Sequence, residues 1–292
     1  MNRRDFLVRS GLAGAAIAAG GLGNLAGAET KGKLPPMPAI KLGGLEVSRL
    51  LLGTNPFFGW AHKPGDLADR MRAWYTDDRI LETLDEAAAH GITAVVGPPY
   101  PRWQVMWRRY RAGGGKLKHW ISQPDRPTEK IPGEIEESVK AGASAVYIQG
   151  HKVEAMYEGN TFEVVREWVD IIRKLGVPAG IGSHRPDCHL EAQKRGFPVD
   201  FYFQCMFNVA HGDSFEKGDP EKAAATIRQL EKPVVAYKIL GAGRLPAPEA
   251  FEFALKNIRP KDGVCVGVYT KDDPGQVAEN ARLAKVLSAK FA

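Results

Sequence analysis

The chain has 292 residues, of which 44% are hydrophobic and 25% charged, with a formal net charge of +6. This composition excludes a disordered chain and a multi-span membrane protein, and so small a charge does not imply a nucleic-acid partner. Three cysteines without a C-x-x-C spacing exclude a disulfide scaffold and a cysteine-bound zinc. We expect a soluble globular protein that is stabilised by its own hydrophobic core.

The first 28 residues have the pattern of an export signal. Paired arginines, Arg3 and Arg4, come first, a weakly apolar stretch rich in glycine and alanine follows, and the segment closes on Ala-Gly-Ala at residues 26–28. This order is typical of a cleaved signal peptide, and the paired arginines resemble the twin-arginine signal. We therefore expect the twin-arginine translocase as a partner during export and a periplasmic or extracellular mature protein. A membrane anchor is the alternative, although the stretch barely has spanning length.

Eight short apolar runs follow a proline-rich lead segment at residues 29–40. The runs are continuous rather than alternating, as in Leu50-Leu51-Leu52, which is typical of parallel strands buried on both faces. The expected strands span residues 48–55, 93–97, 119–123, 145–151, 178–184, 201–208, 233–240 and 264–270.

A helical pattern follows each of these runs. Several patterns begin at Asp, Thr or Pro and end near a glycine such as Gly91 or Gly142, which is the expected asymmetry of helix caps. The expected helices span residues 78–90, 103–111, 132–141, 162–175, 186–195, 220–230, 246–257 and 273–289. Eight βα units predict a single-domain (β/α)8 TIM barrel over residues 41–292. An open doubly wound sheet is the alternative, but no G-x-G-x-x-G follows the first strand.

Two stretches of this pattern are rich in aromatic residues. The long segment at residues 56–77 predicts a lid over the pocket, with a packed excursion that contacts no ligand as the alternative. The basic and aromatic run at residues 102–111 has helical spacing, which favours a barrel helix with a solvated basic face over a nucleic-acid surface.

The expected strand ends are polar, and in a TIM barrel these ends carry the active site. Five of the seven histidines lie at these ends or in the loops after them, namely His62, His151, His184, His189 and His211. Imidazole serves there as a general acid or base or as a metal ligand. No H-E-x-x-H spacing is present, so no metal site is predicted. Amides that bind hydroxyls and aromatic faces that stack on sugars give the expected substrate-binding residues as Asn55, Trp60, His62, Gln123, Asn208 and His211.

Several segments resemble the aldo-keto reductases. The stretch LGGLEVSRL at residues 42–50 with LGT at residues 52–54 is similar to the opening of that family, and residues 267–280 are similar to its closing cofactor-phosphate segment. Gln204 with Asn208, and Ala236-Tyr237-Lys238, fall at its later strand-end signatures. The resemblance implies a barrel that binds NADPH without a Rossmann motif and reduces carbonyls by hydride transfer, with a catalytic tetrad of Asp, Tyr, Lys and His.

This tetrad is only half retained. His151 matches the family histidine and Tyr100 its tyrosine, but Val95 stands at the aspartate position and the lysine position falls on or near Gln123. In the implied mechanism the lysine and aspartate lower the pKa of the tyrosine, so Tyr100 lacks an activator. Lys238 and Lys271 are candidate substitutes. The expected catalytic residues are His151, Tyr100 and His184.

The resemblance also implies a set of NADP(H) contacts. Ser183 and Gln204 match the residues that hold the nicotinamide amide, Tyr237 matches the residue that stacks on the ring, and Lys271 is a candidate for the 2′-phosphate, although Asp272-Asp273 would repel that phosphate. The expected cofactor-binding residues are Ser183, Gln204, Tyr237, Lys238, Lys271 and Asn280.

These observations predict an exported, aldo-keto-reductase-like barrel enzyme that acts on a small carbonyl or sugar-type substrate, with NADP(H) as the candidate cofactor. Two alternatives stay open. One is a cofactor-independent, or less favoured metal-assisted, lyase or isomerase that uses histidine acid–base chemistry. The other is a non-catalytic barrel that binds a small ligand.

Overall fold

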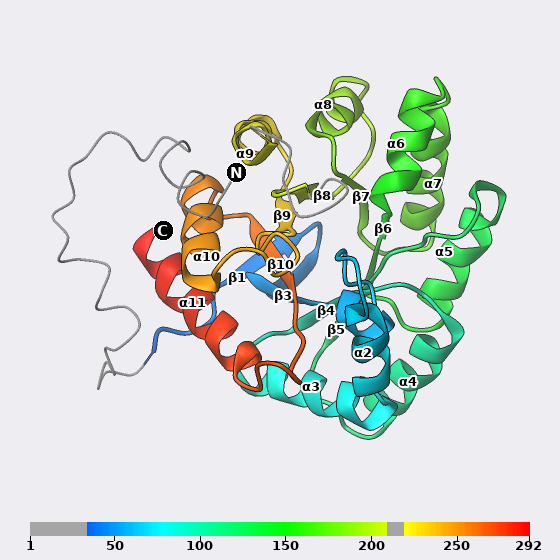
Figure 1. The fold of residues 1–292 in the computed structure, drawn as a ribbon. Helices are drawn as coiled ribbons and strands as arrows, with labels where there is room; N and C mark the ends of the chain where they lie inside the picture. Colours follow the sequence, from blue (N-terminus) through cyan, green and yellow to red (C-terminus); the bar gives the residue numbers. More distant parts are fainter. Residues whose placement is uncertain (1–33, 209–218) are drawn as a thin grey trace, which may run out of the picture. The chain divides into compact units, whose positions relative to one another are not determined.

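The computed structural model describes residues 34–208 and 219–292, and Pro36–Ala292 form one compact unit. Eight parallel strands close into a barrel in the order β10-β3-β4-β5-β6-β7-β8-β9, and helices surround it (Figure 1). The prediction of a (β/α)8 barrel is confirmed, and the open-sheet alternative is wrong because β10 pairs with β3. The proposed signal peptide and His211 lie outside the described residues, and within them no helix is long and apolar enough to cross a membrane.

All eight predicted barrel strands form, but each has only four or five residues. They are β3 (Leu50–Gly53), β4 (Ala94–Gly97), β5 (His119–Ser122), β6 (Ala145–Ile148), β7 (Ala179–Ser183), β8 (Phe201–Cys205), β9 (Val234–Tyr237) and β10 (Gly263–Gly267). The predicted strand ends at His151, His184, Asn208 and Leu240 are wrong because the chain leaves the parallel ladder before them. Apolar residues beyond the ladder, such as the buried Ile239, extended the sequence pattern without extending the strand.

The eight predicted helices are confirmed to within three residues at either end. They are α3 (Asp77–Ala89), α4 (Pro101–Ala112), α5 (Ile131–Lys140), α7 (Glu163–Lys174), α8 (Pro186–Lys194), α9 (Asp219–Gln229), α10 (Ala247–Asn257) and α11 (Gln276–Lys290). Their starts follow from local chemistry, as in α3, where the Thr76 hydroxyl accepts a hydrogen bond from the Arg79 backbone N–H. The run at residues 102–111 lies in α4 and buries Trp103, Met106, Trp107 and Tyr110 against the barrel.

A β-hairpin that the sequence analysis missed closes the N-terminal end of the barrel. Strands β1 (Ala39–Leu42) and β2 (Leu45–Ser48) pair antiparallel, and Ile40, Leu42 and Val47 belong to the buried core. Gly43 has a φ of 63°, and a Cβ there would lie 3.1 Å from the Cβ atoms of Pro178 and Asp200. The lead segment predicted at residues 29–40 therefore ends inside a strand. Two glycines between apolar runs were the available signal.

The predicted lid contains two helical segments rather than one long loop. They are the 3-10 helix η1 (Asn55–Phe58) and the helix α2 (Leu67–Trp74). Phe57 and Tyr75 are fully buried with ring centroids 4.6 Å apart, and the Tyr75 hydroxyl donates to the Val268 carbonyl at 2.7 Å. This part of the segment is packed structure, whereas Trp60 and His62 line the cavity described below.

The structure also contains two short helical segments before α7 that the sequence analysis did not predict. They are η2 (Thr128–Lys130) and α6 (Gly150–Glu158), and α6 begins two residues after β6 ends. His151 therefore lies in the first turn of a helix and not at a strand end. Because α6 begins here, its second turn lies beside the carboxyl ends of the strands. This turn contributes a residue to the site described below.

Candidate active site

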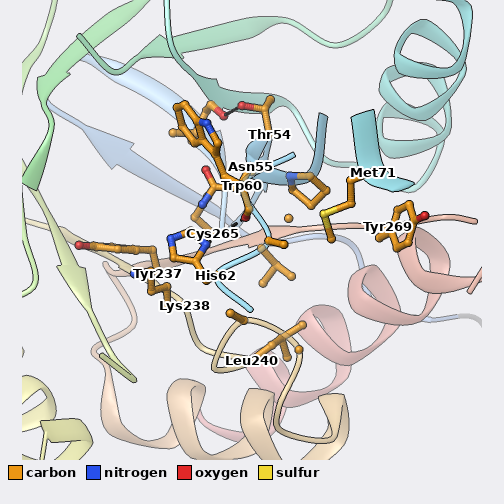
Figure 2. Close-up of a pocket in the computed structure, with 18 of the residues that line it drawn as sticks. Thr54, Asn55, Trp60, His62, Met71, Tyr237, Lys238, Leu240, Cys265 and Tyr269 are labelled. Carbon is orange, nitrogen blue, oxygen red and sulfur yellow. Dashed lines mark hydrogen bonds between the residues drawn. The ribbon is translucent and has the colours of Figure 1, made fainter. Parts of the chain in front are cut away.

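A cavity of about 900 Å³ opens at the carboxyl ends of the barrel strands. This is the end at which TIM-barrel enzymes carry their active sites, and the volume suits a small molecule. Below it the barrel is filled by side chains such as Tyr147 and Phe203, whose rings stack with centroids 4.0 Å apart. Figure 2 shows part of the cavity wall, with His62 close to Tyr237 and Lys238.

His184 joins a carboxylate to an amine at the edge of this cavity. Its Nδ1 lies 3.1 Å from Oε1 of Glu154, and its Nε2 lies 3.3 Å from Nζ of Lys238. Because the carboxylate accepts, Nδ1 carries the proton and Nε2 presents a lone pair to the lysine. The Glu154 Oε1 atom also accepts from the Ser183 hydroxyl at 2.8 Å and from the backbone N–H of His184. The imidazole is therefore fixed in one orientation and one tautomer.

Three elements bring these residues together. Glu154 lies in the second turn of α6, His184 directly follows β7, and Lys238 directly follows β9. Gly150 allows the close approach, because a Cβ there would lie 3.3 Å from His184 Nδ1. Lys238 has a φ of 54°, a left-handed conformation that is uncommon outside glycine and that occurs often at functional sites.

The charges on this side of the cavity follow from burial and hydrogen bonding. Burial alone would raise the pKa of Glu154, but hydrogen bonds from His151 and His184 outweigh it and hold that pKa well below its usual range. Burial lowers the pKa of His184, and the bond to Glu154 only partly opposes this. Burial also lowers the pKa of Lys238. At neutral pH the group therefore consists of an anionic Glu154, a neutral His184 and a lysine that gives up its proton more readily than a free lysine.

His151 stands at the mouth of the cavity. Its ring stacks on His184 with centroids 4.6 Å apart, and its Nδ1 lies 3.4 Å from Oε2 of Glu154. The His151 side chain is 71% exposed, whereas those of His184 and Glu154 are 11% and 13% exposed. The two histidines predicted to be catalytic are therefore in contact, and of the two His184 is the buried one.

The third predicted catalytic residue, Tyr100, lies in a different part of the wall. Its hydroxyl donates to Oδ2 of Asp125 at 2.8 Å, and behind that carboxyl Glu134 accepts from the backbone N–H of Asp125. Burial and the Asp125 carboxylate raise the pKa of Tyr100, and burial raises the pKa of Asp125. The Asp125 carboxylate thus moves the phenol pKa upward, opposite to the activation that the family resemblance implies.

The two groups stand on opposite sides of the cavity. Asp125 follows β5 and Lys238 follows β9, and these strands are four places apart in a closed ring of eight. Both residues line the cavity. A bound molecule can therefore contact a base on one side and a protonated group on the other.

The predicted substrate-binding residues divide into two sets. Asn55, Trp60, His62 and Gln123 line the cavity, Asn208 does not, and His211 lies outside the described residues. Trp60 and Tyr100 meet edge to face with ring centroids 5.9 Å apart. This pair gives the cavity an aromatic wall beside its amides.

Two of the residues matched to the nicotinamide amide do not reach the cavity. The Ser183 hydroxyl donates to Glu154 and accepts from the backbone N–H of Arg185, so its hydrogen bonds are already made. Gln204 is fully buried, and its Nε2 donates to the Cys205 carbonyl at 2.9 Å. Neither side chain lines the cavity.

The residues matched to the rest of the cofactor also fit poorly. Lys271 is exposed, and the carboxylates of Asp272 and Asp273 line the cavity beside it. Asn280 is 2% exposed and lies against a separate small cavity under α11. Tyr237 and Lys238 do line the main cavity. These residues as a set do not fit a nicotinamide nucleotide held as the family resemblance implies.

His151, Glu154 and His184 also form a cluster with the composition of a metal site. One ligand atom from each lies within 4.8 Å of the others, although the sequence analysis predicted no metal. The same atoms are already joined by hydrogen bonds, and the amine of Lys238 lies at the far nitrogen of His184. The cluster is therefore complete as a hydrogen-bonded group, and a cation there would have to displace the Nδ1 proton of His184.

Sequence reasoning missed Glu154 and Asp125. Glu154 lies three residues after His151, a spacing that places both on one face of a helix, but residues 145–151 were expected to form a strand. Asp125 lies two residues beyond the predicted strand end at Gln123. Acidic residues just after strand ends were the available signal for both.

Comparison with known proteins supports the fold. No family model and no curated protein matches the sequence. A candidate aldo-keto reductase from Pseudomonas aeruginosa is 18% identical with a TM-score of 0.61, covering 85% of this chain and 95% of its own. The aldo-keto reductase from Bacillus halodurans in its holo form is 13% identical with a TM-score of 0.56, covering 88% of this chain and 96% of its own.

The same barrel is found in an enzyme with another name. A truncated 3-deoxy-D-arabino-heptulosonate 7-phosphate synthase from Thermotoga maritima is 12% identical with a TM-score of 0.53, covering 87% of this chain and 91% of its own. At these identities the likeness defines the class of fold, a (β/α)8 barrel that aldo-keto reductases share. The reaction has to be argued from the side chains of the cavity.

Proposed function

We propose that this protein is an enzyme that catalyses proton transfer on a small carbonyl or sugar-type compound, as a lyase or an isomerase. The observation that carries this proposal is His184, held by Glu154 on one nitrogen and by Lys238 on the other at the edge of the cavity. A neutral, oriented imidazole can act as a general base at neutral pH.

The opposite wall supplies the complementary group. The Tyr100 hydroxyl donates to Asp125, and the pKa values of both groups are raised, so the phenol on this side keeps its proton where the His184 side accepts one. Two titratable groups whose surroundings push their pKa values apart are the usual arrangement of a catalytic base and acid. His184 or Lys238 would remove a proton next to the carbonyl, and Asp125 or Tyr100 would protonate the developing oxygen.

The cavity lining supports a polar, hydroxylated substrate. Asn55, Gln123 and Gln149 offer amides to hydroxyl groups, and Trp60 offers an aromatic face to a sugar ring. Short ketoses and α-hydroxy ketones such as dihydroxyacetone are the first compounds to test.

Exchange of carbon-bound hydrogen with solvent tests this proposal. In D2O the protein is expected to replace the α-hydrogens of a substrate ketose with deuterium, read by proton NMR without any nicotinamide. His184→Gln is expected to lower the exchange rate by at least about 100-fold. His90→Gln, outside the cavity, serves as the matched control. Equal exchange by His184→Gln and the wild type would overturn the assignment of the base.

An NADP(H)-linked reductase is the second candidate, favoured by the shared barrel and by Tyr237 in the cavity wall. It predicts saturable NADPH binding at micromolar concentration, measured by cofactor fluorescence, and oxidation of NADPH with a carbonyl compound. The hydrogen bonds already made by Ser183, and the burial of Gln204 away from the cavity, favour the proton-transfer enzyme instead. A barrel that only binds a ligand would show affinity without either reaction.

We also propose that residues 1–28 direct export by the twin-arginine route, on the sequence pattern alone. Replacing Arg3 and Arg4 with lysine is expected to leave the protein in the cytoplasm of the producing bacterium. Fractionation followed by immunoblotting measures this, and unchanged export would contradict the proposed route.

A further inference from the structure

Lys238 occupies an unusual position for a lysine. Its side chain is half-buried in the cavity wall, and among the described residues no carboxylate forms an ion pair with it. Its Nζ donates a hydrogen bond to a neutral acceptor, Nε2 of His184, at 3.3 Å. A lysine held at a cavity by an imidazole and not by an acid can lose its proton and become a nucleophile.

A second lysine of the same cavity shows the difference. Lys63 donates to the backbone carbonyl of Gly243 at 3.2 Å, and among the described residues no hydrogen bond joins its amine to an imidazole. A carbonyl oxygen accepts a hydrogen bond but is too weak a base to take a proton from an ammonium group, whereas a neutral imidazole can take one during a reaction. Of these two cavity lysines, Lys238 is therefore the one that stands next to a group able to hold its proton during a reaction.

The backbone supports the same assignment. Lys238 has a φ of 54°, a strained conformation for a residue with a side chain, and it follows the last residue of β9. The rigid barrel thus fixes the root of the side chain, while Glu154 fixes the imidazole that the amine meets. Both reacting partners are preorganised.

We propose that Lys238 is a covalent catalyst that forms an imine with the carbonyl carbon of a small ketone or aldehyde substrate, with His184 as its proton carrier. This inference rests on the proposed function and assigns its substrate class more closely. The bound carbonyl compound becomes an iminium ion, which makes the neighbouring hydrogen acidic and suits the proton transfer or C–C cleavage of an isomerase or lyase.

The step balances without any further reactant. The Lys238 ammonium gives a proton to Nε2 of His184, and the free amine attacks the carbonyl carbon. The C–N bond forms as the carbonyl π bond opens, and a proton of the attacking nitrogen passes to the carbonyl oxygen. The resulting carbinolamine then loses its oxygen as water, with the proton that His184 holds, and the C=N bond forms. The overall change is one ammonium group and one carbonyl giving one iminium ion and one water, with no oxidation or reduction.

A 1,3-diketone tests the nucleophile without knowledge of the substrate. Acetylacetone condenses with a nucleophilic lysine to give an enaminone that absorbs in the near ultraviolet. The purified protein is expected to form this adduct at neutral pH, and peptide mass spectrometry is expected to place it on Lys238. Lys63→Arg should keep the adduct, and Lys238→Arg and His184→Gln should lose it. No adduct on the wild-type protein, or one unchanged in Lys238→Arg, would overturn the inference.

Borohydride trapping with dihydroxyacetone separates this inference from the proposed function. Reduction of the imine is expected to add the mass of the ketone less one oxygen atom at Lys238. Deuterium exchange of the ketone is measured on the same samples. Exchange without an adduct would overturn the imine and leave the proton-transfer function in place. An adduct without exchange would support the nucleophile and overturn that function. Circular dichroism of Lys238→Arg and Lys238→Met separates loss of chemistry from loss of fold, and the mapping on wild-type protein needs no variant.

Discussion

The two sides of the cavity each present a carboxyl group, and the two carboxyl groups behave in opposite ways. The pKa of Glu154 lies well below its usual range, because His151, His184 and a backbone N–H donate to it. The pKa of Asp125 is raised, because burial outweighs its one hydrogen bond from Tyr100 and the nearby cations. The number of donors around a carboxyl group can therefore outweigh its burial and reverse the direction in which its pKa moves.

This difference assigns the roles across the cavity. Glu154 keeps His184 neutral, oriented and in contact with Lys238, so that side accepts protons. Asp125 and Tyr100 share a proton at the far wall, so that side donates one. Four variants test the comparison, in decreasing order of expected effect.

Glu154→Gln is expected to have the largest effect. The amide of glutamine is uncharged, and one of its two terminal atoms is a donor instead of an acceptor. It therefore holds the His184 imidazole less firmly in one orientation and one tautomer. We expect the rate of deuterium exchange to fall by about 1,000-fold with the fold retained. Glu158→Gln, on the same helix but with an exposed carboxylate, is the control. An exchange rate within tenfold of the wild type would show that Glu154 does not orient the catalytic base.

Acid is expected to lower the free energy of unfolding of the protein through His189. His189 is fully buried, burial lowers its pKa to about 4, and its Nε2 donates to the Phe203 carbonyl. Between pH 6.5 and 4 the unfolded chain binds a proton that the folded chain does not, so the free energy of unfolding falls by roughly 3 kcal/mol as the pH decreases. Urea unfolding at several pH values measures this.

His189→Gln identifies the source of that acid sensitivity. The variant has no imidazole at this position, so its free energy of unfolding should change less across the same pH range. His90→Gln should keep the wild-type slope. Identical slopes in all three proteins would show that other groups cause the loss.

Tyr100→Phe tests the proton-donating wall. Removing the phenol takes one hydrogen bond from Asp125, so the pKa of that carboxyl should rise further. We expect exchange to slow by about 10- to 100-fold and the alkaline limb of its pH profile to move to higher pH. A limb that stays in place would show that Asp125 is not the group that titrates.

His151→Ala is expected to have the smallest effect. The side chain is 71% exposed and its contact with Glu154 is long, so we expect less than about a tenfold loss of activity. The metal-assisted alternative predicts a much larger loss, together with inactivation by a chelator. Metal analysis and activity measured with EDTA therefore decide whether His151, Glu154 and His184 act as a hydrogen-bonded group or as metal ligands.

The barrel could be predicted from the sequence because the same local pattern, an apolar run followed by a helix, repeats along the chain. Eight apolar runs with a capped helix after each one leave few other folds, and the helix ends agree to within three residues. The hairpin at residues 39–48 was missed because its first strand was divided between the proline-rich lead segment and the start of the barrel, and its last residue was assigned to the first barrel strand.

The site was predicted less completely, for a physical reason. Its residues are joined by contacts between distant parts of the chain: Glu154 and His184 are 30 residues apart, and His184 and Lys238 are 54 apart. Polar strand ends identified His184 and Lys238 as residues of interest. Which of them touch depends on α6, a short helix whose first residues were assigned to the strand expected at residues 145–151, and this assignment hid Glu154.

Solvent exchange in the absence of any nucleotide tests the central claim most directly. The wild-type protein and His184→Gln are incubated with dihydroxyacetone and related ketoses in D2O, and the α-hydrogens are followed by NMR. The account predicts that the wild-type protein exchanges the α-hydrogens of at least one ketose and that His184→Gln does not. Exchange with none of them, together with NADPH oxidation by the same protein and a carbonyl compound, would contradict it.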